Sequence, residues 1–164
     1  MLSIVQSMKD LNFSALMEVY SEGNRENARD LYPHLLEGQG ILQAEQDFHQ
    51  YLWETFFRTA GACYAIWQQE ERYICALRLE PYRDGVLLNG LETAPEYRRQ
   101  GYARRLMQAA LGLCGECKVY SHVHKRNTPS LQLHLQCGFQ RISEQAVYLD
   151  GSVNSYCCTL CYQA

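Results

Sequence analysis

Six consecutive residues have the types and the spacing to bind an anion. They read Arg98-Arg99-Gln100-Gly101-Tyr102-Ala103, and they join an apolar segment to an amphipathic helix expected from Gly101 to about Leu113. The first amides of a helix have no intrahelical acceptor, and the helix dipole is positive there. Gly101 lets the backbone approach a ligand closely, Ala103 is small, and the two arginines add charge. The stretch predicts a cradle suited to a pyrophosphate, whereas the simpler interpretation is a tight turn with a solvated face.

The elements around this segment predict a mixed α/β fold. Strands are expected at Leu2–Ser7, Ala62–Gln69, Arg72–Glu80, Gly85–Thr93 and Lys118–His124. Helices are expected at Phe13–Tyr20, Ala44–Phe57, Gly101–Leu113 and Thr128–Gly138. The strand-helix-strand unit between residues 85 and 124 predicts a parallel strand pair.

Three further local features complete the expected fold. Thr128 is the expected N-cap of the last helix, with Pro129 at its first position. The stretch Gly23–Pro33 is polar and broken, and the tail is expected to form two strands around Asp150-Gly151. We therefore expect one domain, residues 1–164, with a central mixed sheet of about seven strands and helices on both faces.

Composition and charge exclude some classes of function. Hydrophobic residues make up 47% of the chain, charged residues 20%, and the net charge is -3. This balance argues against nucleic-acid binding, the alternative role for Arg98, Arg99, Arg104 and Arg105. The segment MLSIVQSMKDLNF lacks the pattern of a signal peptide, and no apolar run approaches the ~18 residues of a membrane span. We expect a cytoplasmic protein without membrane partners.

The cysteines and histidines predict no metal site. The chain has eight cysteines, which should be mostly reduced in the cytoplasm. Cys114 and Cys117 have zinc-knuckle spacing, but two further ligands are only loosely available at Cys157–Cys161, so buried free thiols are expected instead. His122 and His124 have no carboxylate or cysteine near them in the sequence.

Two motifs resemble those of a known enzyme family. The spacing Arg98-x-x-Gly101-x-Ala103 resembles the acyl-CoA signature of the GCN5-related N-acetyltransferase (GNAT) family. The later stretch NTPSLQLHLQCGF, residues 127–139, resembles that family's second motif, with His134 where the family usually has tyrosine. The resemblance covers residues 85 to about 142.

The resemblance implies acetyl-CoA as co-substrate. In the family this molecule lies in a V-shaped opening between two parallel strands, which correspond here to Gly85–Thr93 and Lys118–His124. Backbone groups at Leu91 and Thr93 would bind the pantetheine arm, and the amides of residues 98–103 would bind the pyrophosphate. Asn127 and Ser130 would contact the pantetheine or thioester region, although Asn127 also suits the start of a helix.

The implied reaction is acetyl transfer to a primary amine by direct attack. At the family's tyrosine position, His134 would act as the acid at the leaving sulfur, or it would only pack at the cofactor's edge. Glu92 follows Leu91 at the end of a strand and would act as the base, or it would only bind a basic substrate. A catalytically weak module that binds and senses acyl-CoA is the alternative function.

The acceptor amine, a small molecule or a peptide, is not identified by the sequence. Tyr120, His122 and His124 share a strand face that could line its pocket, or they could be packed and hydrogen-bonded. The aromatic stretch FHQYLWETFF, residues 48–57, suggests an apolar pocket wall, but core packing would explain it too. A homodimer is left open.

Overall fold

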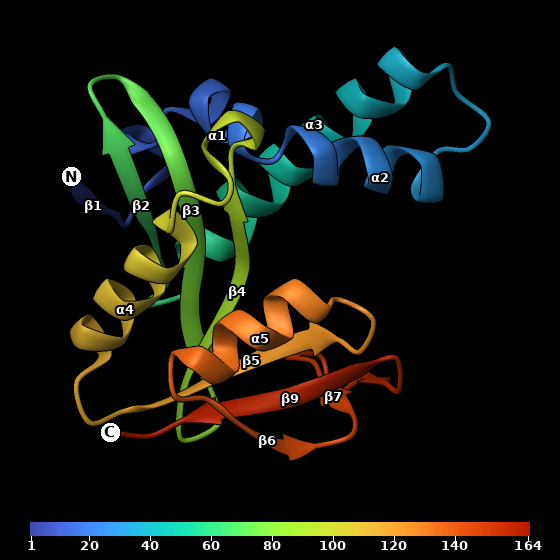
Figure 1. Ribbon diagram of the computed structural model, residues 1–164. Coiled ribbons are helices and arrows are strands. Elements are labelled where there is room, and N and C mark those ends of the chain that lie inside the picture. The colour runs from blue at the N-terminus through green and yellow to red at the C-terminus, as the bar shows by residue number, and fades with distance from the viewer.

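A seven-stranded sheet forms the centre of the computed structural model, which describes residues 1–164. The strands lie in the order β1-β2-β3-β4-β5-β9-β6 (Figure 1). Their bounds are β1 Leu2–Val5, β2 Cys63–Gln69, β3 Arg72–Tyr82, β4 Gly85–Thr93, β5 Lys118–His124, β6 Gln140–Ser143 and β9 Cys157–Tyr162. Only β4 and β5 pair in parallel, because helix α4 carries the chain across between them.

Five α-helices surround the sheet. They are α1 Phe13–Val19, α2 Ser21–Leu31, α3 Glu37–Glu54, α4 Tyr102–Cys114 and α5 Thr128–Gln136. Short 3-10 turns cover Met8–Asp10, Phe56–Arg58 and Pro95–Tyr97. The mixed sheet with helices on both faces confirms the predicted fold class.

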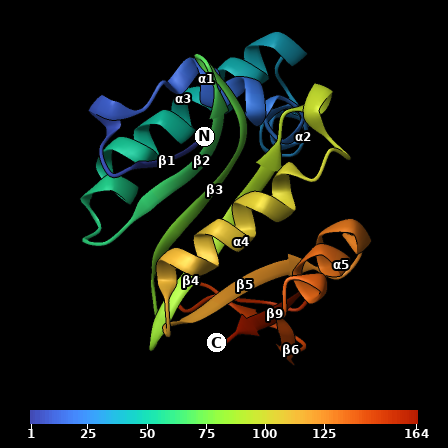
Figure 2. The same cartoon turned by 60° about the vertical axis from the view of Figure 1, so that its left-hand side comes forward.

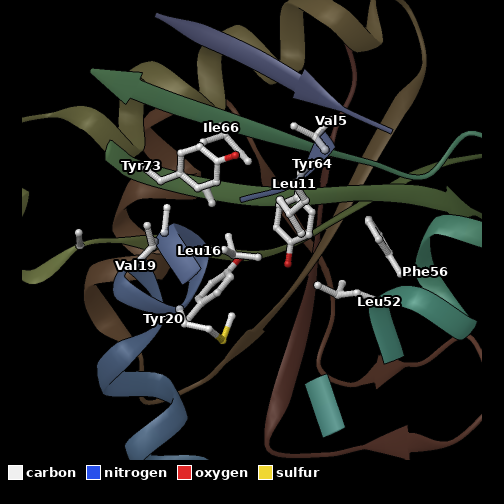
Figure 3. Packing of buried hydrophobic residues seen from close by; sticks show 14 of the residues in the cluster. Val5, Leu11, Leu16, Val19, Tyr20, Leu52, Phe56, Tyr64, Ile66 and Tyr73 are labelled. Carbon is white, nitrogen blue, oxygen red and sulfur yellow. The ribbon is translucent and has the colours of Figure 1, made fainter. Parts of the chain in front are cut away.

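Strand alternation divides the core into two layers. On one face, Tyr64 and Ile66 of β2 pack with Leu16 of α1, with Leu52 of α3 and with Phe56 of the 3-10 turn that follows α3 (Figure 3). On the other face, residues of β2, β3 and β4 pack against the apolar stripe of α4. Figure 2 shows α4 lying across this second face, with α5 beside β5.

The prediction of a broken segment at Gly23–Pro33 is wrong, because α2 occupies most of it. Only Asn24 and Ala28 of this helix are buried, so its sequence carries little apolar pattern. The helix packs on α3, where a side chain on Gly40 would lie 3.4 Å from the Ala28 Cβ. Helix α3 also begins seven residues before the predicted Ala44, at Glu37.

The tail differs in part from the prediction. Asp150-Gly151 does form a turn, but it joins two short strands, β7 Ala146–Val147 and β8 Val153–Asn154, which pair only with each other. The tail's strands in the main sheet are β6 and β9, and β9 inserts between β5 and β6.

Helix α4 begins at the predicted anion cradle, so its packing against the sheet fixes the position of the cradle. Leu106 lies on its buried stripe and is 0% exposed. We expect Leu106→Ala to lower the free energy of unfolding by about 2–5 kcal/mol, through lost burial and a residual cavity. Urea denaturation measures the change. Leu113→Ala is the matched control: it removes the same atoms from an exposed position of the same helix and should change stability by less than about 0.5 kcal/mol. Equal effects of the two substitutions would contradict the packing of α4.

Candidate active site

A cleft opens where two parallel strands separate. Strands β4 and β5 pair only from Gly85 to Leu88 and from Lys118 to Ser121, and beyond these residues they diverge (Figure 2). Backbone groups of β4 after Leu88 therefore have no partners on β5 and are free to pair with a ligand. Helices α4 and α5 flank the opening.

The start of α4 supplies unpaired amides at one end of this cleft. Gly101 caps the helix in the left-handed conformation, φ 81°, and its carbonyl accepts from the Arg105 amide at 3.1 Å. Arg99 also has a positive φ, 59°, a conformation that costs energy for a residue with a side chain and that clusters at binding sites. None of the amides from Arg99 to Arg104 donates to another backbone group. The turn therefore presents several N–H donors and arginine side chains to one place.

Most of the predicted cofactor residues meet in this cleft, which has a volume of about 790 Å³. The predicted residues that line it are Leu91, Glu92, Thr93, Arg98, Arg99, Gly101, Tyr102, Ala103, Asn127 and Ser130. Gln100 does not line it, because its side-chain amide turns back to the Glu96 carbonyl at 3.1 Å.

Two of these residues also hold the walls of the cleft in place. Arg98 donates from Nε to the Thr93 carbonyl at 3.1 Å and forms an ion pair with Glu22, so it ties the end of β4 to α2. Asn127 caps α5 by accepting from the Ser130 amide at 3.2 Å. The predicted N-cap, Thr128, is instead the first residue of the helix.

Glu92 lies in an environment that favours its protonated form. A Cβ on Gly23 would lie 2.6 Å from the Glu92 Oε1, so α2 passes directly over this carboxyl group. The pKa of Glu92 is raised to about 7, mainly by burial and to a smaller extent by the negative charges of Glu26 and Glu22, while the positive charge of Arg98 lowers it. A carboxyl group with this pKa can both accept and return a proton near neutral pH.

A second, smaller cavity meets the cleft at this carboxyl group. This side pocket has a volume of about 320 Å³, and Gly23 and Glu92 line both spaces. Its other lining residues are Tyr20, Asn24, Asn27, Leu31, Ala44, Asp47, Phe48, Arg78 and Gly90. A long molecule in the cleft and a small one in the side pocket would thus meet at Glu92.

Comparison with protein families connects this geometry to a known group. The model of the acetyltransferase (GNAT) family matches residues 27–139, more than half of the chain. The chain belongs to this family. The sequence resemblance noted at residues 98–103 and 127–139 lies inside the matched region.

Solved structures share the fold of this GNAT protein at low sequence identity. The PaiA N-acetyltransferase of Thermoplasma acidophilum, solved with coenzyme A, is 16% identical over 100% of this chain and 99% of its own, with a TM-score of 0.68. The ribosomal-protein-S18-alanine N-acetyltransferase of Escherichia coli is 15% identical over 99% and 94%, with a TM-score of 0.62. A spermidine N-acetyltransferase chimera from Vibrio cholerae SpeG and hSSAT is 18% identical over 99% and 95%, with a TM-score of 0.61. A search of curated proteins finds no match.

The GNAT protein's His134 does not line the cleft, contrary to the position expected for an acid at the leaving sulfur. Its ring is buried, with Nε2 at 2.9 Å from the Ser121 Oγ of β5 and Nδ1 at 2.7 Å from the Ser130 carbonyl. A carbonyl only accepts, so Nδ1 carries the proton and Nε2 accepts from Ser121. Desolvation lowers the pKa of His134, although the bond to the Ser130 carbonyl opposes this, and the ring is neutral.

The strand face of Tyr120, His122 and His124 does not line either cavity. Tyr120 donates to Asp84 and packs against Tyr82. His122 lies between Tyr82 and Tyr148, and its Nδ1 is 3.2 Å from the Thr159 Oγ1. These contacts favour the packing interpretation over the acceptor-pocket interpretation.

Several residues that line the two cavities were not predicted from the sequence. Arg104 of α4 lines the cleft, and its position one turn into the amphipathic helix was the available signal. Gly23 and Asn24 were missed because α2 was not predicted. Arg78 was missed as a site residue, although an arginine inside the apolar strand Arg72–Tyr82 is itself unusual.

No group of three or more His, Cys, Asp or Glu side chains lies together in a way that could hold a metal ion. No helix is long and apolar enough to span a membrane. All eight cysteines are free thiols, but the prediction that they are buried is wrong for Cys114, which is only partly buried, and for Cys117, which is exposed.

The pKa of Glu92 predicts the pH dependence of a reaction in which it accepts a proton. Because this pKa is about 7, the basic form increases as pH rises through 7, and kcat/KM should rise with it. Glu92→Gln keeps the shape of the group and should lower kcat by 10²-fold or more, the low end of the range for general-base catalysis. A pH profile of kcat/KM for both proteins tests this. Near-normal turnover of Glu92→Gln across the pH range would show that Glu92 does not act as the base.

The environment of His134 predicts a structural role. Its pKa is lowered in the folded protein, so the unfolded chain binds a proton more readily and stability should fall as pH drops below about 6.5. His134→Phe should remove this part of the pH dependence and cost about 1–3 kcal/mol, because the buried Ser121 hydroxyl loses its partner. Thermal unfolding from pH 5 to 8 measures both effects, and turnover of the folded variant should stay within a few-fold. A stable variant with greatly reduced turnover would instead indicate that His134 takes part in the reaction.

Proposed function

We propose that this GNAT protein transfers the acetyl group of acetyl-CoA to a primary amine. The observation that carries the proposal is the meeting of the cleft and the side pocket at Glu92. The cleft would hold the donor, the side pocket would hold the acceptor, and a carboxyl group with a pKa of about 7 would lie between them.

Binding of the donor follows from the polar groups along the cleft. The pyrophosphate would accept hydrogen bonds from the free amides of residues 99–104, and Arg99 and Arg104 would add charge. The pantetheine amides would pair with β4 backbone groups near Leu91 and Thr93, which β5 leaves free. Asn127 and Ser130 would form the opposite wall.

The transfer step needs no covalent enzyme intermediate. The acceptor arrives as an ammonium ion with an ordinary pKa of about 10.4, and Glu92 takes one proton from it directly or through water. The amine nitrogen then bonds to the acetyl carbon, and the carbonyl oxygen gains negative charge that a free β4 amide would stabilise. The carbon–sulfur bond breaks, and the nitrogen loses its second proton to water. Coenzyme A leaves as a thiolate, which takes up one proton, and Glu92 releases the other to solvent before the next turnover.

A matched pair of glycine substitutions tests donor binding. Gly101→Glu places a bulky carboxylate at the cradle, where a Cβ meets no other atom within 4 Å, so the fold should survive with modest strain from the positive φ. Coenzyme A binding measured by calorimetry should be abolished. Gly112→Glu adds the same charge to an exposed part of α4 and should bind coenzyme A normally. Unchanged affinity in a folded Gly101→Glu protein would contradict the assignment.

A thiol-release assay with a panel of primary amines separates the proposed enzyme from an acyl-CoA sensor. Release of coenzyme A that depends on both an amine and Glu92 supports transfer. Tight donor binding without amine-dependent release would favour the sensing function. The cytoplasmic location and a homodimer stay predictions from the sequence.

A further inference from the structure

A guanidinium group without a carboxylate partner lies in the side pocket. Arg78 comes from the middle of β3 and lines the pocket. It takes part in none of the six ion pairs of the protein, and its Nε is fully buried with no hydrogen-bond partner. An arginine stays charged at any ordinary pH, and a buried donor without a partner is costly.

Aromatic rings hold the guanidinium in place without giving its Nε–H an acceptor. The Arg78 Cζ lies 5.4 Å from the ring centre of Phe48, 5.5 Å from Tyr51 and 5.8 Å from Phe56. These cation–π contacts stabilise the charge, but a ring face does not replace an oxygen acceptor in the plane of the group. Gly90 makes room on another side, since a Cβ there would lie 3.0 Å from the Arg78 Nε.

The register of β3 and β4 places Arg78 near the proposed base. Ala76 pairs with Glu92, and Arg78 lies two residues further along the same face of β3. The register shifts between these two positions of β3, so Arg78 pairs with Asn89, and both Arg78 and Glu92 line the side pocket. Glu92 and Arg78 are therefore opposite charges within one pocket of about 320 Å³.

The other acid of the pocket is already engaged. Asp47 is exposed, and it accepts hydrogen bonds from Tyr32 and from Gln43. Glu80, the acid nearest to Arg78 along β3, accepts from Asn89 at 2.6 Å and forms no ion pair. Neither carboxylate neutralises the guanidinium by direct contact.

We propose that the acceptor is a free amino acid, which binds with its carboxylate at Arg78 and its amine at Glu92. This inference rests on the proposed function and names the substrate class of the same site. A carboxylate matches the planar donors of a guanidinium, and the pair of hydrogen bonds fixes the orientation of the ligand. The amine of the oriented molecule then faces the acetyl group in the cleft.

The first test compares substrates on the unaltered protein. Each amino acid is assayed beside its carboxamide and its decarboxylated amine, which keep the side chain and lose the negative charge. The amino acids should have kcat/KM values roughly 10- to 100-fold higher, the range for a hydrogen bond to a charged group, and most of the difference should be in KM. Equal or better activity with the uncharged partners, or with polyamines, would overturn the inference and leave the proposed acetyl transfer intact.

The second test uses substitutions of Arg78. Arg78→Gln should abolish the preference for the carboxylate, and Arg78→Lys should keep part of it through charge alone. Arg83→Gln is the control, because Arg83 also stacks on two tyrosine rings, Tyr82 and Tyr120, but lies outside the pocket. It should keep the full preference. A folded Arg78→Gln protein with unchanged preference would contradict the role of Arg78.

A binding measurement keeps the inference testable if turnover is absent or if Arg78→Gln does not fold. N-acetyl amino acids carry the carboxylate without a reactive amine, and calorimetry with coenzyme A present compares them with their N-acetyl carboxamides. Tighter binding of the carboxylates by the unaltered protein supports the inference. Equal binding, or none, overturns it. Failure of every amine in the thiol-release assay would instead contradict the proposed function.

Discussion

The separation of β4 from β5 is the constraint on which the candidate site depends. Four residue pairs hold the two strands together, and then Gly90, with φ 61°, and a register shift in the β3–β4 ladder turn β4 away. A closed sheet would use the backbone groups of residues 89–93 internally. Because the strands part, these groups face a cleft, and α4 can begin at its edge with unpaired amides. One irregularity in the sheet thus creates both the backbone donors and the space for a long ligand.

Helix α2 completes this opening and changes the chemistry inside it. It passes so close to Glu92 that a Cβ at position 23 would lie 2.6 Å from the Glu92 Oε1 and would force that carboxyl group to move, and it brings Glu22 and Glu26 near the same group. Burial and like charge together keep the pKa of Glu92 near 7, while the Glu22–Arg98 ion pair ties the helix to the end of β4. A helix with few buried residues is therefore more important to the site than to the core. A strand-end carboxylate without this cover would have a pKa too low for a base that acts near neutral pH.

Much of the cleft could be predicted from the sequence, because its turns and helix starts depend on neighbouring residues. The parts that were not predicted depend on tertiary packing. The turn at Gly101 and the start of α5 at residues 127–130 have sequence signals that act within a few residues, so their place in the cleft was predictable. Helix α2 buries only Asn24 and Ala28, and such a weak apolar pattern does not distinguish it from a loop. The position of His134 on a helix was also predicted, but its direction depends on Ser121 of β5, a partner thirteen residues away. No spacing rule within α5 could show that the ring faces the sheet.

The charges of the side pocket link Arg78 to Glu92. When Glu92 is ionised, the pocket wall carries a negative group at Glu92 and a positive group at Arg78, and the exposed Asp47 adds a second negative charge to the lining. A ligand with an amine and a carboxylate reproduces this pattern with the signs reversed, and each of its charges gains a partner as water is displaced. A ligand with amines alone would leave the guanidinium unpaired and would bring further positive charge toward it. The aromatic rings of Phe48, Tyr51 and Phe56 fix the guanidinium before any ligand arrives, so little side-chain entropy remains to be lost on binding. The aromatic rings and the nearby Glu80 offset part of the cost of burying this arginine, and a carboxylate on the acceptor would offset more of it.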